Sequence, residues 1–258
     1  MGVVNVTPDS FSDGGKFMDA RAAVAHARQL IEEGAHILDI GGESSRPGAA
    51  PVSADDECAR IVPVVRALRD DAIPVSVDTV KPEVMRAVLA EGATMINDIT
   101  ALAAPGALET VAAGDCAVCL MHMQGGPRTM QLSPRYDNVV REVREFLASR
   151  VDAVERAGIA RDRIVIDPGF GFGKTVEHNL ELLRRLDEFT GMNLPVLAGW
   201  SRKSSLGTIT GRSAADRLPA SLAAALIAVQ NGAALVRVHD VAATRDALAV
   251  WTAVTRAG

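Results

Sequence analysis

Polar side chains that can bind a ligand stand at the ends of short apolar runs in this sequence. Asp78, Asn97 and Asp167 each close a different run. Carboxylates only accept hydrogen bonds, whereas an amide both donates and accepts them. Three such groups, if the fold brings them together, suit a planar heterocycle that carries neighbouring donors and acceptors.

A second group of residues is cationic. Arg237 and His239 stand two residues apart in the last apolar run, so on an extended chain both side chains point the same way. With Arg46 they form a set suited to a phosphate-type group, because a guanidinium can bind two phosphate oxygens at once. The sequence therefore predicts an anion site in addition to the heterocycle site.

Eight apolar runs alternate with helical stretches, and this alternation positions the polar residues. Near-continuous apolar strands separated by helices are typical of a parallel sheet covered by helices. Eight such units favour a (β/α)8 TIM barrel forming one domain over residues 1–258, with a doubly wound open sheet as the alternative. The predicted strands cover residues 3–6, 37–40, 75–78, 94–99, 117–122, 163–167, 194–198 and 234–239.

In such a barrel the carboxyl ends of all strands lie at one face, where barrel enzymes place their catalytic groups. Taken singly, Asp78 also fits a helix cap, Lys203 an exposed loop lysine and His239 a structural histidine. Their shared position at strand ends favours a common site. Two further strand ends contribute Asn5 and His122.

Composition limits the classes of function. The net charge of −5 gives no basic field that would attract nucleic acid. No apolar stretch approaches the ~18 residues of a membrane span, and no signal peptide precedes the first strand. Three cysteines favour a reducing compartment, so a cytoplasmic protein without membrane or nucleic-acid partners is expected. Cys116 and Cys119 are three apart in a predicted strand, so they are expected on opposite faces.

Gly173-Lys174-Thr175 looks like the end of a phosphate-binding P-loop, which requires Gly-x4-Gly-Lys-[Ser/Thr]. Pro168 occupies the position of the first glycine. Binding of ATP through this segment is therefore not expected. Its glycines are instead expected to let the backbone approach a ligand closely.

Seven motifs are spread along the chain. They are NVTPDSFSDGG (5–15), GGESSRPG (41–48), SVDT (76–79), INDI (96–99), DPGFGFGK (167–174), SRKS (201–204) and RVHD (237–240). With these motifs the sequence resembles, across essentially its whole length, the dihydropteroate synthase family. The resemblance implies a (β/α)8 barrel and a transferase of folate biosynthesis. The implied reaction condenses 6-hydroxymethyl-7,8-dihydropterin diphosphate with 4-aminobenzoate, giving 7,8-dihydropteroate and pyrophosphate.

The resemblance also implies roles for individual residues. The pterin would be bound by Asp78, Asn97, Asp167 and Lys203. Asn5 would help to position Mg²⁺ on the diphosphate, and the phosphates would be contacted by Ser45, Arg46, Arg237 and His239. The 4-aminobenzoate pocket would be shaped by Phe11, Pro47, Phe172, Lys203 and Ser204.

The implied chemistry is SN1-like: the diphosphate leaves first, and the aniline nitrogen then attacks a pterin methylene cation. Cationic groups and Mg²⁺ would stabilise the leaving group, and Asp13 would stabilise the developing cation. The catalytic set is thus Asp13, Lys203, Arg237 and His239. Loops rich in Gly, Ser and Asp would close over the site.

The family further implies a homodimer and a target for sulfonamides. Relatives commonly carry a leading segment before the first strand, and this sequence is expected to lack it. Ser45 stands where many relatives have threonine, which keeps the hydroxyl group, and Trp200 is bulkier than expected.

Two other functions stay open. A methyltransferase acting on methyltetrahydrofolate would also hold a pterin, but it would not need the phosphate-binding Arg46, Arg237 and His239. A pterin-binding relative without catalysis would show changes in the first two loops or at Lys203, and none is visible.

Overall fold

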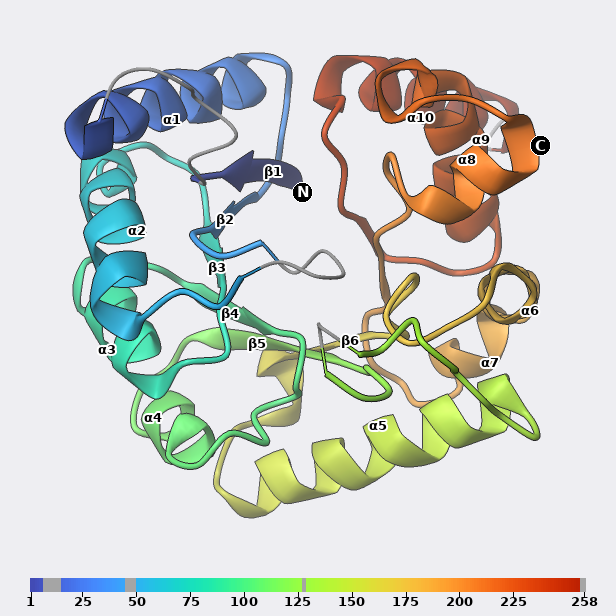
Figure 1. Cartoon of the computed structure of the whole chain (residues 1–258), viewed down its shortest axis with the longest axis horizontal. Helices are drawn as coiled ribbons and strands as arrows, with labels where there is room; N and C mark the ends of the chain where they lie inside the picture. Colours follow the sequence, from blue (N-terminus) through green and yellow to red (C-terminus); the bar gives the residue numbers. More distant parts are fainter. Residues whose placement is uncertain (7–14, 45–49, 127–128, 256–258) are drawn as a thin grey trace.

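Eight parallel strands form the inner layer of the protein, as seen in a computed structural model that describes residues 1–6, 15–44, 50–126 and 129–255 (Figure 1). The first six strands pair in sequence order, and the last two pair with each other. The strands are β1 (Gly2–Asn5), β2 (Leu38–Gly41), β3 (Val75–Asp78), β4 (Met95–Asp98), β5 (Ala117–Met121), β6 (Ile164–Asp167), β7 (Leu197–Ala198) and β8 (Leu235–Val236).

Two single bridges join these sheets into a closed barrel. Ile166 pairs with Val196 just before β7, and Gly2 of β1 pairs with Val238 just after β8. The predicted (β/α)8 barrel is therefore confirmed. The last two strands are shorter than predicted, two residues each, because regular pairing ends there while the chain stays connected through the bridges.

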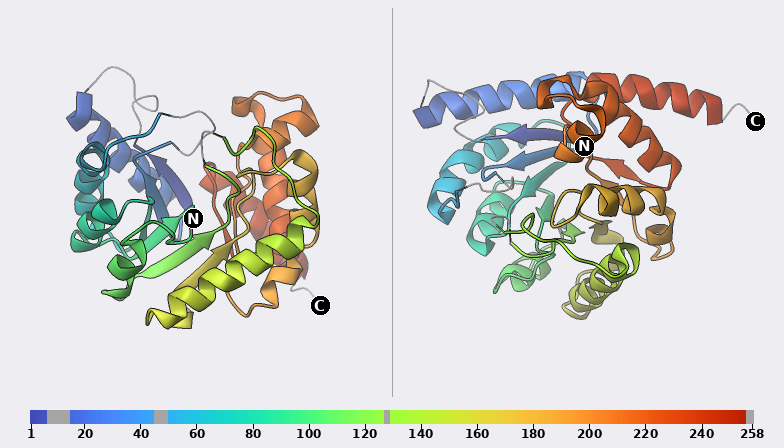
Figure 2. Two further views of the ribbon diagram at one scale, coloured as in Figure 1. Left: turned by 60° about the horizontal axis from the view of Figure 1, so that its bottom comes forward. Right: turned by 45° about the vertical axis from the view of Figure 1, so that its right-hand side comes forward.

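Helices form an outer ring around the strands (Figures 1 and 2). The described residues contain ten α-helices rather than the eight predicted, because two follow β6 and two follow β7. The helices are α1 (Gly15–Glu32), α2 (Ala54–Leu68), α3 (Pro82–Ala90), α4 (Ala107–Ala112), α5 (Val139–Arg156), α6 (Val176–Arg184), α7 (Asp187–Thr190), α8 (Ser204–Thr210), α9 (Leu218–Gln230) and α10 (Val241–Thr255).

Local capping explains several helix starts. Ser53 accepts a hydrogen bond from the Asp56 amide at the start of α2. Helix α5 begins at Val139, where the Asn138 side chain caps it by accepting from the Arg141 amide. The cap therefore leaves residues 134–138 as part of the loop after β5.

The alternation of the strands divides the interior into two environments. Val75 and Val77 of β3 belong to the apolar core beneath the helices, whereas Asp78 points into the barrel. Met95, Cys119 and Leu197 form a separate apolar cluster within the barrel. Cys116 packs in the outer core instead, so the two cysteines lie on opposite faces as predicted.

Within the described part of the chain, no helix combines the length and hydropathy that crossing a membrane requires.

Candidate active site

Carboxylate and amide side chains from neighbouring strands meet inside the barrel near its carboxyl end. Asp78 ends β3, Asn97 lies in β4 directly opposite it in the strand register, and Asp167 ends β6. Asn97 and Asp167 are buried, and Asp78 is half-buried. The predicted heterocycle-binding residues thus come from three strands with fixed backbones.

The cation at the centre of this group is Arg237. Its Nε donates to Asp39 Oδ2 at 2.5 Å, and its Nη2 lies 3.3 Å from Asp78 Oδ2. Residues 237 and 39 are far apart in sequence, and the closure of the barrel brings them together. The two carboxylates raise the pKa of Arg237 further and keep it charged, although burial opposes this.

Asp39 lies in the middle of β2 and was not singled out from the sequence. It is fully buried, and its Oδ2 also accepts a hydrogen bond from Asn97 Nδ2 at 3.1 Å. A signal was present: a carboxylate in the apolar run 37–40 is rarely buried unless it is paired.

Burial governs the protonation of the other carboxylates. It raises the pKa of Asp78 to about 7, against the opposing effect of Arg237 and with a further increase from Asp39. Burial also raises the pKa of Asp167, while the nearby Lys203 ammonium lowers it. The site therefore holds carboxylates that are more easily protonated than exposed ones.

The loop 168–175 after β6 is organised by close backbone packing. Asp167 Oδ1 accepts from the Gly169 amide at 2.7 Å. Gly169 has a φ of +72°, and a Cβ there would stand 1.9 Å from the His122 carbonyl oxygen; at Gly173 it would stand 2.3 Å from that of Gln124. These glycines were expected to let the backbone approach a ligand closely. At Gly169 and Gly173 the close approach is instead to the backbone of the loop after β5.

Lys174 fixes the same loop from inside. Its Nζ lies 2.9 Å from His122 Nδ1 and donates to the carbonyls of Gly169 and Phe172 at 3.0 and 3.1 Å. Burial lowers the pKa of Lys174 well below its usual value and that of His122 to about 3. The lysine of the P-loop-like sequence is thus 2% exposed and tied to the protein, which agrees with the exclusion of a P-loop.

Lys203 stands at the N-cap of α8, in the loop after β7. The preceding Arg202 adopts a φ of +59°, a conformation that its contacts hold: its amide donates to Ser221 Oγ at 3.0 Å and its side chain pairs with Asp240. The Lys203 ammonium donates to the Phe170 carbonyl and lies 4.9 Å from the centre of the Phe172 ring.

Burial lowers the pKa of Lys203 to about 8, while Asp167 opposes the shift and Arg237 adds to it. Phe170 beneath it packs on Trp200 with ring centres 5.0 Å apart. The unexpected Trp200 is therefore 3% exposed and supports the loop that carries the Lys203 contact.

The remaining predicted residues lie around this centre. The His239 amide and Nδ1 contact Ser201 Oγ at 3.2 and 3.0 Å, which joins the loops after β7 and β8. Ser204 is exposed at the start of α8. Asn5 ends β1, and its Oδ1 lies over Gly41 at the end of β2, on the side of Asp78.

Five predicted site residues lie outside the described residues. They are Phe11, Asp13, Ser45, Arg46 and Pro47.

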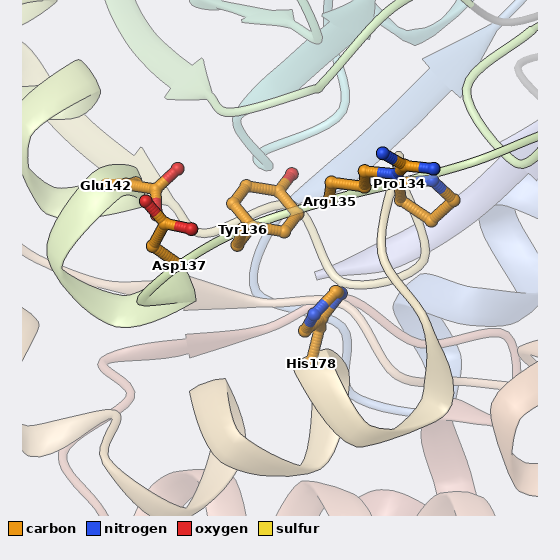
Figure 3. Close-up of a pocket in the computed structure, with 6 residues that line it drawn as sticks. All are labelled: Pro134, Arg135, Tyr136, Asp137, Glu142 and His178. Carbon is orange, nitrogen blue, oxygen red and sulfur yellow. The ribbon is translucent and has the colours of Figure 1, made fainter.

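A separate pocket of about 480 Å³ lies beside α5 and the start of α6 (Figure 3). Tyr136 and His178 face each other in it, with ring centres 5.0 Å apart, and the Tyr136 hydroxyl donates to the Gly173 carbonyl at 2.8 Å. The pocket therefore adjoins the outer side of the loop that Lys174 fixes, and it was not foreseen from the sequence. It is lined by Pro134, Arg135, Tyr136, Asp137, Glu142 and His178.

This arrangement of a barrel and an internal polar site occurs in known proteins. Residues 1–239 match the family of pterin binding enzymes. The chain belongs to this family. The dihydropteroate synthase of Escherichia coli strain K12 is 51% identical over 251 residues, which cover 97% of this chain and 89% of that protein.

Solved structures of family members superimpose closely. The dihydropteroate synthase of Xanthomonas albilineans with 4-aminobenzoic acid has a TM-score of 0.95 and 55% identity, covering all of this chain and 93% of that one. The same enzyme has been solved in complex with 7,8-dihydropteroate, with a TM-score of 0.92 and 52% identity, and with coverage of 100% and 94%. The Yersinia pestis enzyme in complex with a sulfonamide drug has a TM-score of 0.95 and 46% identity, with coverage of 100% and 94%.

Proposed function

We propose that this chain condenses 6-hydroxymethyl-7,8-dihydropterin diphosphate with 4-aminobenzoate to give 7,8-dihydropteroate and pyrophosphate. The observation that carries this is the group of Asp78, Asn97 and Asp167 beside the cations Arg237 and Lys203. Relatives that match nearly all of this chain and are named dihydropteroate synthase support it.

In the proposed complex the pterin lies across the carboxyl ends of β3, β4 and β6. Carboxylates of Asp78 and Asp167 accept hydrogen bonds from its N–H groups, with Asp167 on the guanidine-like edge, and Asn97 adds an amide. Lys203 donates to an acceptor on the heterocycle. Because Asn97 and Asp167 are buried, a ligand lacking the matching polar atoms leaves them unpaired, and this produces specificity.

The diphosphate is proposed to contact Arg237 and His239, together with Ser45 and Arg46 from the loop after β2. Asn5 fits a role in binding Mg²⁺, because its amide oxygen ends β1 next to the carboxyl ends of β2 and β3. The described residues hold no cluster of three His, Cys, Asp or Glu side chains for a metal. Mg²⁺ commonly takes one or two protein oxygens and completes its shell with phosphate and water. When bound, it would neutralise charge on the leaving diphosphate.

The bond between the pterin methylene carbon and the diphosphate oxygen breaks first, and its electron pair leaves with pyrophosphate. The aniline nitrogen then uses its lone pair to form the new C–N bond and loses a proton. We assign the 4-aminobenzoate pocket to Phe11, Pro47, Phe172, Lys203 and Ser204, and the stabilisation of the methylene cation to Asp13.

Turnover by the purified chain tests the proposal. Incubation with both substrates and Mg²⁺ is expected to give pyrophosphate and dihydropteroate in equal amounts, with activity lost in Lys203→Ala. Arg86→Ala, which removes an exposed cation on α3, is the matched control and is expected to keep full activity. Binding of the pterin diphosphate without turnover would identify a non-catalytic relative and contradict the proposal.

The order of bond breaking has its own test. If the diphosphate leaves first, pyrophosphate is released slowly in the absence of 4-aminobenzoate, because water captures the methylene cation. Omission of Mg²⁺ is expected to slow this release. Absence of any release without the amine, under conditions of full turnover with it, would favour a concerted displacement.

We further propose a homodimer in the cytoplasm. Helices α9 and α10 pack together on one side of the barrel and leave apolar side chains exposed, with Ile227 44%, Val250 67% and Val254 73% accessible (Figures 1 and 2). Three free cysteines support a reducing compartment. A sedimentation experiment is expected to give twice the mass of one chain. The Ile227→Glu variant is expected to sediment with the mass of a single chain.

A further inference from the structure

The buried Asp39 is not assigned a role by the reaction described above. Its side chain has no exposed surface, and it lies inside the barrel between two groups of the proposed site. Oδ2 accepts from Arg237 Nε at 2.5 Å and from Asn97 Nδ2 at 3.1 Å. The other oxygen, Oδ1, is buried without a hydrogen-bond partner among the described residues, so the contacts that join Asp39 to the site are these two.

We infer that Asp39 is a positioning residue, which orients the Asn97 amide and the Arg237 guanidinium for binding the pterin diphosphate. This rests on the proposed function.

The orientation of Asn97 follows from the chemistry of its partner. A carboxylate only accepts hydrogen bonds, so the NH2 group of Asn97 faces Asp39 and the amide oxygen faces the other way. That oxygen is buried and has no hydrogen-bond partner among the described residues. A buried acceptor without a partner costs free energy until a donor arrives. Asp39 thereby makes Asn97 an acceptor for an N–H group of the heterocycle.

The orientation of Arg237 is fixed in the same way. Asp39 binds Nε and Asp78 lies against Nη2, so the guanidinium plane is held between β2 and β3. Within the described part of the chain, Nη1 makes no hydrogen bond to the protein. An arginine held at two of its nitrogens presents its remaining N–H groups in one direction, which reduces the entropy lost when an anion binds.

Substitution of Asp39 by asparagine tests this role with little change of shape. The new side chain can present an NH2 group to Asn97, which turns the Asn97 amide over or leaves it unpaired. The KM for the pterin diphosphate is expected to rise about 10- to 100-fold, the range of one unsatisfied buried group. The KM for 4-aminobenzoate, measured at saturating pterin, is expected to stay within about twofold.

Asp98→Asn is the matched control. Asp98 is equally buried, at the end of β4 directly after Asn97, but among the described residues its carboxylate accepts hydrogen bonds from Thr100 and Leu102 of the following loop and not from Asn97 or Arg237. It is expected to lower thermal stability while the KM for the pterin diphosphate stays within about threefold. A KM for Asp39→Asn equal to that of the control would overturn the positioning role.

An exchange of the two side chains provides a second test if Asp39→Asn does not fold. Asn97→Asp alone places two carboxylates against each other and is expected to raise KM more than about 100-fold. In Asp39→Asn/Asn97→Asp, the amide now on β2 donates to the carboxylate now on β4, whose other oxygen still faces the pterin. The double variant is expected to recover at least about tenfold in KM. Recovery below twofold would contradict the role of Asp39, whereas absence of turnover in the unaltered chain would contradict the proposed function.

Discussion

The two sides of the site are held by different means. Acceptors on the first side, Asp39, Asp78 and Asn97, stand on strands of four residues with a continuous register. The cations Lys203 and Arg237 follow strands of only two residues, which join the rest of the barrel through single bridges. Regular strand pairing therefore fixes the acceptors, whereas the cations have fewer backbone hydrogen bonds, such as that from the Arg237 amide to the Ala198 carbonyl, and depend more on side-chain contacts.

The contacts on the cation side come from loops and from the acceptors themselves. Arg202 pairs with Asp240 at 2.5 Å, and Arg217 donates to the Arg202 carbonyl at 3.0 Å. Arg237 is held by carboxylates from the opposite side of the barrel. A substitution among the acceptors is therefore expected to displace Arg237 as well. A substitution among the cations is expected to displace the acceptors less, because their positions are set by strand pairing.

The largest effect on catalysis is expected at Asp167. Its carboxylate accepts a hydrogen bond from the loop 168–175 and interacts electrostatically with the Lys203 ammonium. Asp167→Ala removes an acceptor for the pterin and the partner of the Gly169 amide. We expect kcat/KM for the pterin diphosphate to fall by about 10³-fold or more, since a site built to bind polar groups loses that much without its partner. Steady-state kinetics measures it, and a loss below tenfold would contradict the placement of the pterin.

Two lysines, the buried Lys174 and the half-buried Lys203, are expected to act on different properties, one on stability and the other on binding. Lys174→Met leaves two carbonyls and His122 without their donor, so the free energy of unfolding is expected to fall by about 2–4 kcal/mol. Lys203→Met is expected to change it by less than about 1 kcal/mol and to abolish activity. Chemical denaturation measures both, and equal destabilisation would show that the cation side is structural as well.

Asp78→Asn tests the cost of burying charge beside Asp39. Because the pKa of Asp78 is raised from 3.8 to about 7, the folded state binds a proton that the unfolded state has lost over this interval. Stability from this group therefore falls as the pH rises from about 4 to about 7 and is level above. Relative to the unaltered chain, the variant is expected to gain in Tm between pH 5 and 7 and no further at pH 8. A constant difference in Tm across this range would contradict the shift.

The smallest effect expected is a pH dependence from Lys203. Its pKa is lowered to about 8, so the ammonium is lost as the pH rises through this value. For the free enzyme, kcat/KM for the pterin diphosphate is expected to fall about tenfold per pH unit above that point. Arginine stays charged at these pH values. Lys203→Arg is therefore expected to have a lower kcat/KM overall, but one that no longer falls as the pH rises above about 8. Persistence of the limb in the variant would assign it to another group.

Much of this arrangement follows from local patterns in the sequence. The alternation of apolar runs and helical stretches determines a parallel barrel, because buried parallel strands need helices on their outer side. Asp78, Asn97 and Asp167 could be predicted as a group, since parallel strands end at one face. The predicted cations Lys203 and Arg237 also lie at this site.

Other features are decided by tertiary structure. Asp39 reads as part of an apolar run, and only closure of the barrel between β8 and β1 brings Arg237 to it. The sequence argues against a phosphate-binding role for Lys174, but only the tertiary structure shows that this lysine turns inward against the loop after β5. Gly169 and Gly173 indicate from the sequence that some group comes close to the chain, and the structure shows that this group is the backbone of residues 122 and 124. Local sequence determines which strands and helices form, whereas contacts between residues far apart in the chain depend on how the whole barrel closes.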